Sequence, residues 1–206
     1  MENPIRNRGK SEQKRQQILD AACNLFLKEG FEGVSMDAVA KSADVSKQTV
    51  YSHFGNKEEL FSASVEFECD KHEINDQLFD PERPVEQVLL ELATHFTDLL
   101  LSEQAIRLHR ICVASTDQRS TIAELFWSAG PVKLKARLSH YLKQQVERGT
   151  LSIPNIDFAA QQLIFMLKGE YHHRRIFGLS DGKPEAELPA YLQSCVTLFL
   201  SAYAKK

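Results

Sequence analysis

The segment 46–54 concentrates side chains that can bind a nucleic acid, namely Lys47, Gln48, Tyr51 and His53. They comprise a cation, an amide that can pair bidentately with adenine, and groups that donate hydrogen bonds to phosphate oxygens. Val50 and Phe54 alternate with them at helical spacing, so they are expected to form the buried side of a short helix. The pattern alone favours DNA contact over its alternative, an ordinary corner between two helices with a polar surface.

Further helices must hold that polar face in place. Ser46 is a good N-cap for the short helix, and Ser35 is a good N-cap for another helix of about two turns before it. Helices this short are marginal on their own, because helix nucleation is costly. They are therefore expected to pack on a helix over 18–29 and on the helix that begins at Lys57. Asn56 and Glu59 resemble a capping box at the start of this later helix.

Three ordered motifs in this region resemble a known family. They are Ile18-Leu-Asp-Ala-Ala-x-x-Leu-Phe followed by Gly30-Phe, then Ser35-Met-Asp-Ala-Val-Ala, then Val45-Ser-Lys-Gln-Thr-Val-Tyr-Ser-His-Phe-Gly-Asn-Lys-Glu-Glu-Leu-Phe. Residues 14–61 are similar to the DNA-binding domain of the TetR family of bacterial transcription regulators. One departure is Asp44, where family members usually have Gly in the turn. Asp tolerates left-handed backbone better than most residues, so the turn is expected to form at a slight cost.

The resemblance implies which residues contact DNA. The start of the second helix would meet the DNA backbone, the third helix would approach bases and phosphates, and Lys57 would bind a phosphate with help from its helix dipole. The expected DNA contacts are Ser35, Met36, Ser46, Lys47, Gln48, Thr49, Tyr51, His53 and Lys57. The basic arm around Arg6 and Arg8 would add minor-groove or backbone contacts.

Most of the remaining chain repeats apolar residues at helical spacing, and no segment alternates as a strand would. An all-α fold of about nine helices is predicted. An N-terminal arm and a three-helix helix-turn-helix domain would occupy 1–56, and a larger α-helical domain for ligand binding and dimerisation would occupy 57–206. One helix is expected from Lys57 to about Phe79. Another, over 120–148, is expected to be interrupted near Pro131, because a proline cannot keep its helical hydrogen bond.

Composition and charge narrow the class of protein. The net charge of −3 hides an asymmetry, because residues 1–15 hold five basic and two acidic side chains. A basic arm on an acidic body suits a chain that seeks phosphate. The four cysteines form no C-x-x-C pair and are expected to be reduced core thiols. The start of the chain is polar, and no uncharged apolar stretch reaches the roughly 20 residues of a membrane span. We expect a soluble, cytoplasmic protein without a membrane partner.

The C-terminal part resembles a second pattern, over Arg110–Leu179. Its motifs Phe126-Trp-Ser-Ala-Gly-Pro, Tyr141-Leu-Lys-Gln-Gln-Val-Glu-Arg-Gly-Thr-Leu and Leu167-Lys-Gly-Glu are similar to the C-terminal domain of AefR-like members. The family's last two long helices form its dimer, and 156–177 and 186–203 suit that role because they are apolar on several faces. A homodimer would present two helices to DNA half-sites about one turn apart. The alternative is a monomer that buries these helices in its own core.

A ligand pocket is expected between helices of the body. The candidate lining residues are Phe67, Phe96, Leu100, His109, Cys112, Phe126, Trp127, Met166, Tyr171 and His172. Each has a simpler interpretation as core. Polar groups on apolar stripes are the better candidates, which favours His109, Trp127, Tyr171 and His172. No His, Asp or Glu arrangement repeats at ligand spacing, so no metal and no cofactor is expected.

The predicted function is a sequence-specific regulator that binds double-stranded operator DNA as a homodimer. The favoured mechanism is a repressor that a small-molecule effector releases from its operator. Control by a protein partner or by oxidation of Cys69 or Cys112 is the alternative. An enzyme or small-molecule carrier is disfavoured, because the sequence holds no nucleophile–base pair, phosphate loop or metal cluster.

Overall fold

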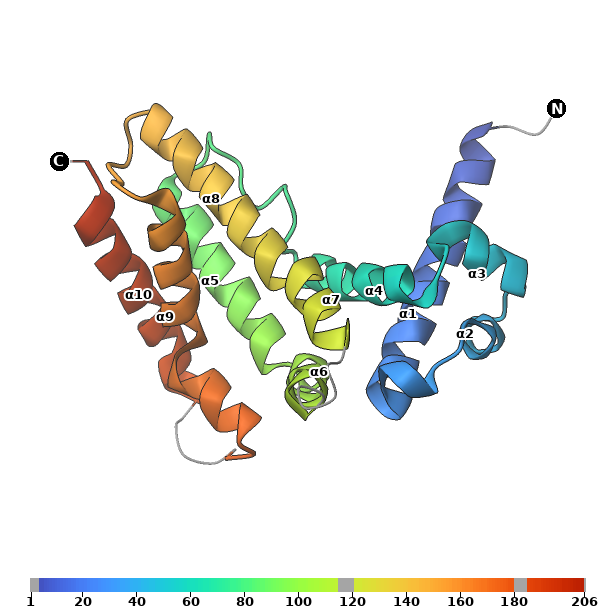
Figure 1. Cartoon of the computed structure of the whole chain (residues 1–206). Helices are drawn as coiled ribbons and strands as arrows, with labels where there is room; N and C mark the ends of the chain where they lie inside the picture. The colour runs from blue at the N-terminus through green and yellow to red at the C-terminus, as the bar shows by residue number, and fades with distance from the viewer. Residues whose placement is uncertain (1–3, 115–120, 180–184, 206) are drawn as a thin grey trace. The chain divides into compact units, whose positions relative to one another are not determined.

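The computed structural model describes residues 4–114, 121–179 and 185–205 (Figure 1). Within these ranges it contains α-helices, one short 3-10 helix and no strand, which confirms the predicted all-α fold. The helices are α1 (Pro4–Gly33), α2 (Met36–Ser42), α3 (Lys47–Phe54), α4 (Lys57–Lys71), α5 (Val85–Leu101), α6 (Glu103–Ala114), α7 (Thr121–Ala129), α8 (Pro131–Glu147), α9 (Ile156–Ile176), η2 (Glu185–Glu187) and α10 (Leu188–Tyr203). The break at Pro131 separates α7 from α8, so the described chain has ten α-helices where about nine were expected.

The chain divides into two compact units. Unit one comprises Met1–Glu68 and Ile111–Gly130, and unit two comprises Cys69–Arg110 and Pro131–Lys206. The functional division between 1–56 and 57–206 stays a prediction. Among the described residues, no helix is both long enough and apolar enough to cross a lipid bilayer.

Aromatic packing joins the first and fourth helices of unit one. The Phe26 and Phe61 rings meet edge to face with centroids 5.2 Å apart, and Phe31 meets Phe61 in the same way at 5.4 Å. Edge-to-face pairs stabilise beyond the area they bury, because the positive ring edge meets the negative face. α2 packs on both α1 and α3. The short helices are therefore held on a longer support, as their length requires.

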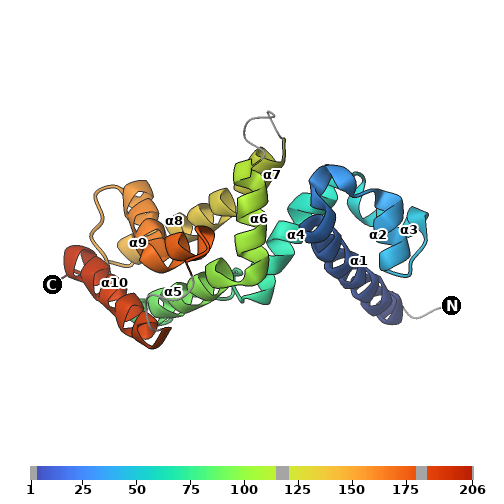
Figure 2. The same ribbon diagram turned by 90° about the horizontal axis from the view of Figure 1, so that it is seen from below.

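The core of unit two lies among α5, α8, α9 and α10. α9 packs against the other three (Figure 2). Backbone hydrogen bonds close the end of this bundle, because Ser152 N–H donates to the Tyr203 carbonyl at 2.8 Å and Lys205 N–H donates to the Thr150 carbonyl at 3.1 Å. These bonds tie the end of α10 to the connection between α8 and α9.

The predicted extent of the helix that begins at Lys57 is wrong. α4 ends at Lys71, two turns before Phe79. Glu73 adopts a left-handed φ of 57°, and the Ile74 N–H donates to the Cys69 carbonyl at 3.0 Å. This is the closure of a Schellman motif, which normally places glycine at the left-handed position. Burial of Ile74, 1% exposed, supplies the apolar contact that accompanies such a stop.

Candidate nucleic-acid interface

The two short helices begin as the sequence predicts. The Ser35 Oγ accepts from the Ala38 N–H at 3.1 Å, and the Ser46 Oγ accepts from the Thr49 N–H at the same distance. Each bond satisfies a backbone donor that a helix start leaves without an intrahelical partner. The Ser46 and Thr49 hydroxyls also share a 2.8 Å hydrogen bond. These contacts fix the residue at which α3 starts and the conformation of its first turn.

The turn between α2 and α3 forms with Asp44 in place of glycine. Asp44 has a φ of 52°, in the left-handed region that the sequence analysis anticipated. The Val45 N–H reaches back to the Ala40 carbonyl at 3.0 Å and closes the end of α2. The tight corner of a helix-turn-helix is therefore complete.

α3 has one buried and one exposed side. Val50 is fully buried and Phe54 is 4% exposed, which confirms that both belong to the core. On the other side Lys47 and Gln48 are exposed, and Tyr51 is 43% exposed. Thr49 and His53 are half-buried at the edge between the two sides. α3 can therefore present its polar side chains to the major groove of DNA while its buried side stays packed on the neighbouring helices.

Two of the expected contacts are placed differently from the others. Met36 is 6% exposed, so it can offer DNA only its backbone N–H at the start of α2. The Lys57 ammonium donates to the Phe31 carbonyl at 2.9 Å and lies 4.4 Å from the centre of the Phe31 ring. Lys57 therefore ties the start of α4 to the end of α1, and this contact competes with any phosphate contact.

An ion pair that the sequence patterns did not indicate spans the two short helices. Lys47 Nζ lies 2.7 Å from one Asp37 carboxylate oxygen and 3.0 Å from the other. The hydrogen bond that Lys47 donates to Asp37, together with the negative charge of this carboxylate, raises the pKa of Lys47. Lys47 Nζ also lies 5.8 Å from the centre of the Tyr51 ring. Asp37 lies in the first turn of α2 and Lys47 in the first turn of α3. These positions could have indicated the ion pair from the sequence.

The start of α4 is capped as expected, with a variation. The Asn56 Oδ1 accepts from the Glu59 N–H at 2.8 Å, and the Asn56 amide donates to the Glu59 carboxylate at 2.8 Å. The reciprocal bond thus comes from a side-chain amide instead of the backbone N–H of a capping box. Gly55 precedes it with a φ of 60°, a conformation that other residues rarely adopt.

The residues expected to line a ligand pocket fall in both units. In unit one, Phe67 and Cys112 are buried and Phe126 is half-buried, whereas Trp127 is 54% exposed. The expectation that Trp127 lies on an inward face is therefore wrong. In unit two the buried members are Phe96 and His172, and the half-buried members are Leu100, His109, Met166 and Tyr171. The structure brings His109 and His172 into contact, with ring centroids 5.4 Å apart.

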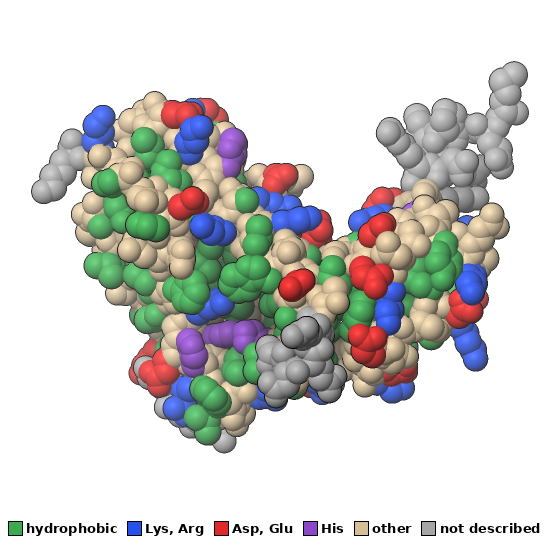
Figure 3. All heavy atoms as spheres, in the orientation of Figure 1, with side chains coloured by type: hydrophobic (Ala, Val, Ile, Leu, Met, Phe, Trp, Pro, Cys, Tyr) green, Lys and Arg blue, Asp and Glu red, His purple; other side chains and the backbone are tan. Residues whose placement is uncertain are grey.

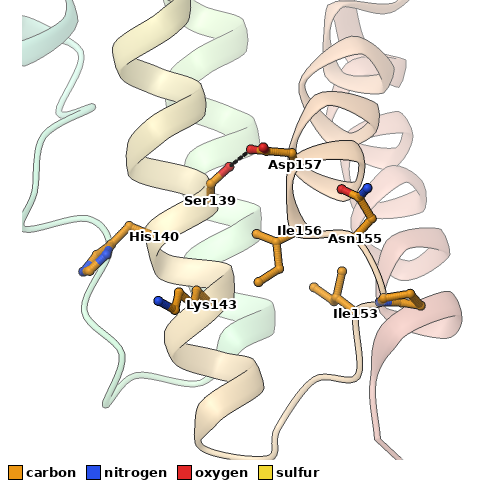
Figure 4. Close-up of a pocket in the computed structure, with 8 residues that line it drawn as sticks. Ser139, His140, Lys143, Ile153, Asn155, Ile156 and Asp157 are labelled. Atoms are coloured by element: carbon orange, nitrogen blue, oxygen red, sulfur yellow. Dashed lines mark hydrogen bonds between the residues drawn. The ribbon is translucent and has the colours of Figure 1, made fainter.

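A recess between α8 and the start of α9 does not involve these residues (Figure 4). Its lining is Ser139, His140, Lys143, Ile153, Pro154, Asn155, Ile156 and Asp157. The Ser139 hydroxyl donates to the Asp157 carboxylate across it at 3.3 Å, and the Lys135 ammonium lies 3.6 Å from the same carboxylate. The Ser139 hydroxyl and the Asp157 carboxylate are thus already paired within the protein, so the recess is a poor candidate for a ligand site.

Large apolar side chains remain exposed on the last two long helices of unit two. Phe158 and Phe165 on α9 are 63% and 56% exposed, and Leu198 on α10 is 61% exposed. Phe158 and Phe165 are seven residues apart, a spacing that places both on one side of a helix. Exposed apolar groups of this size commonly mark a surface that another protein covers.

Two family models match the chain and cover most of it. Residues 18–64 match the bacterial regulatory proteins of the tetR family, and residues 87–205 match the C-terminal domain of AefR-like transcriptional repressors. The chain belongs to the TetR family of transcriptional regulators. Both resemblances that the motifs indicated are therefore confirmed.

Solved structures and curated relatives agree with this assignment. A TetR-family regulator from Mesorhizobium loti shares 28% identity at a TM-score of 0.74, with 95% of this chain and 98% of that chain covered. The Flavonoid-responsive Regulator FrrA shares 27% identity at a TM-score of 0.71, over 95% and 99%. The regulator AcrR of Shigella flexneri is 33% identical over 48% of this chain and 46% of its own length. The chain thus matches less than half of the length of the curated relatives.

Proposed function

We propose that this TetR-family regulator is a repressor that binds a specific operator through the exposed side of α3. The observation that carries the proposal is the arrangement of Lys47, Gln48 and Tyr51 on a short helix with a buried back. A helix of this width fits the major groove, where an amide can distinguish adenine and cations contact phosphates. Because chromosomal DNA is the proposed ligand, the proposed location is the cytoplasm.

The protein would act as a homodimer through α9 and α10. The exposed Phe158, Phe165 and Leu198 support this interface, because burial of such side chains against a second copy is favourable. Two-fold symmetry would place two copies of α3 on half-sites of a palindromic operator.

A small-molecule effector would release the repressor from DNA. The similarity to FrrA, a flavonoid-responsive regulator, supports control by a small molecule over the alternatives. Control by oxidation of Cys112 is disfavoured, because burial raises the pKa of this thiol to about 11 and the thiolate is the reactive form. A hundredfold release from DNA requires roughly 2.7 kcal/mol of differential effector affinity between the bound and free conformations.

Selection of bound genomic fragments tests the proposal. The purified protein is mixed with sheared genomic DNA at moderate salt, and the retained fragments are sequenced. We expect enrichment of a short palindrome. Fluorescence anisotropy on that palindrome should then show tighter binding than on a scrambled duplex. Equal affinity for the palindrome, the scrambled duplex and a polyanion such as heparin would rule out a sequence-specific regulator.

A further inference from the structure

Four basic side chains lie together where α6 meets the second half of α9 in unit two. The His109 and His172 rings are edge to face at 5.4 Å, and the His172 and His173 ring centroids are 6.0 Å apart. Lys168 precedes His172 by four residues on α9, across the non-helical Gly169, and its charge acts on both the His172 and the His109 rings. Histidine side chains are grouped on the face of unit two drawn in Figure 3. We call His109, Lys168, His172 and His173 the basic cluster.

Arginine contacts hold the two helices around this cluster. The Arg110 guanidinium on α6 donates to the Ile176 carbonyl at 2.9 Å and to the Arg175 carbonyl at 2.7 Å. The Arg175 guanidinium in turn donates to the Leu101 carbonyl at 3.0 Å. Cations at the C-terminal end of a helix are favoured by its dipole. Both guanidinium groups bind backbone carbonyls, and the Glu170 carboxylate, which lies between Lys168 and His172 in the sequence, pairs with Arg174 at 3.8 Å.

The cluster has no internal anion. His172 is 6% exposed, and its ring contacts the rings of His109 and His173. The groups that act on His172 are His109 from α6 and Lys168 and His173 from α9, all of them basic. Burial and these neighbours lower the pKa of His172 to about 4, and burial also lowers the pKa of His109 and of Lys168. The free protein therefore disfavours the charged forms of these side chains, and a bound anion would stabilise those charged forms.

We propose that the basic cluster binds the carboxylate group of a small organic acid. Neutral imidazoles can each donate one N–H, the Lys168 ammonium can donate more, and a carboxylate can accept several such bonds. This inference rests on the proposed function in one respect, because the bound acid would be the effector. It adds the chemical class of that effector and the residues that recognise it.

A metal ion fits the cluster less well than an anion. Metal sites normally combine histidines with carboxylates or thiolates, and the described residues hold no group of three such ligands. An organic cation is disfavoured, because the Lys168 ammonium would repel it. The basic residues instead match a single negative group that arrives with the ligand.

Binding of the acid should be coupled to proton uptake. A carboxylate beside His172 favours the imidazolium and raises its pKa, so the complex holds a proton that the free protein lacks. Affinity should then weaken as pH rises above the raised pKa of the complex. One coupled proton corresponds to a loss of about tenfold in affinity per pH unit.

Histidine NMR on the full-length protein tests the proposal, with benzoate and decanoate as the carboxylate probes and benzamide as the uncharged control. Millimolar benzoate or decanoate should shift the His109 and His172 ring resonances and raise the pKa of His172, whereas benzamide should not. His109→Gln and Lys168→Met should each weaken binding at least tenfold while the fold is retained. His140→Gln, on exposed surface of α8, should leave binding unchanged.

Each outcome decides the matter. If neither carboxylate shifts these resonances, or if benzamide binds equally well, the carboxylate site is overturned. A response to Zn²⁺ alone, with none to the acids, would also overturn it in favour of a metal site. Operator binding is measured separately without any probe. Loss of operator binding with intact histidine shifts would refute only the regulator, and the reverse result would refute only the carboxylate site.

Discussion

Lys47 already contacts other side chains of α2 and α3 in the absence of DNA. Its ammonium pairs with Asp37 across the turn and lies near the Tyr51 ring. An exposed pair of this type contributes little to stability, because water screens it and two long side chains lose freedom. Its consequence is for binding, since a phosphate has to displace a carboxylate that already neutralises the cation.

Substitution of either partner should change operator binding in opposite directions. Lys47→Ala should weaken binding and lower the slope of affinity against salt by about one, because one phosphate contact is lost. Asp37→Asn should tighten binding by up to about fivefold, since the competing ion pair is exposed and water screens it. Anisotropy titrations at several salt concentrations measure both effects.

Lys143→Ala serves as the control, because Lys143 is an exposed lysine of α8 that pairs with Glu147. Binding by Lys47→Ala that equals the control would show that the assigned face does not meet DNA.

His172 predicts a dependence of stability on acidity. Its pKa in the folded protein is about 4, below the ordinary value of 6.5. Between pH 6.5 and about 4, the unfolded chain therefore binds a proton at His172 that the folded chain does not bind. The free energy of unfolding falls as pH drops through this range. The slope from one group is at most about 1.4 kcal/mol per pH unit.

Thermal unfolding from pH 7 to 5 should reveal this effect. The Tm of the parent protein should fall more steeply than that of His172→Phe, because phenylalanine has no group that titrates. The His140→Gln variant should follow the parent. Parallel curves for all three proteins would mean that His172 is not held neutral by burial.

Individual elements show where sequence patterns were sufficient. The caps at Ser35 and Ser46 and the left-handed Asp44 depend on neighbours within five residues, so local chemistry predicts them. The end of α4 did not follow from the pattern, because apolar residues continue past Lys71 and a glutamate occupies the left-handed position. The Arg110 contacts with α9 join residues more than sixty positions apart, a proximity that only the folded chain defines.

α9 is kinked at Gly169, and the kink is tightly specified. Gly169 has a φ of 51°, and an added Cβ would lie 2.8 Å from the Tyr191 hydroxyl. That hydroxyl donates to the Met166 carbonyl at 2.7 Å and so satisfies an acceptor at the kink. A rigid phenol ring cannot move aside as a flexible chain end could. The bend is thus a property of the packed pair α9 and α10.

Replacement of this glycine should be costly. Gly169→Ala combines an unfavourable backbone conformation with a clash and should destabilise the protein by roughly 1–3 kcal/mol. Gly33→Ala is a matched control, because its added Cβ would meet only the Glu29 Cβ at 3.4 Å. Chemical denaturation measures both. An unchanged midpoint for Gly169→Ala would show that α9 does not need its kink.

In the proposed dimer, the whole molecule would bring two copies of α3 to one duplex. The exposed side chains of α9 and α10 are the proposed contact between copies. Sequence periodicity indicated that these helices were apolar on several sides, but it could not separate Leu163, which is fully buried, from Phe165, which is exposed. That distinction depends on which helices of unit two cover each side.

A charge on this surface should separate the copies. Leu198→Arg should yield a monomer in light scattering after gel filtration, because a charged group would be buried without a partner. Operator affinity should fall at least tenfold, since each copy would then hold only one half-site. Val132→Arg, on exposed α8, should remain dimeric. A dimer that persists in Leu198→Arg would place the contact elsewhere.

The Lys57–Phe31 contact has a consequence for how a signal could reach the DNA. The ammonium, the carbonyl and the three phenylalanine rings lock the ends of two helices together, so α4 cannot slide along α1 without breaking several contacts at once. A displacement that arrives through α4 is therefore expected to move α1 together with it. Regulation would then change the distance between operator half-sites that a dimer can span, and leave the internal geometry of each DNA-reading surface intact.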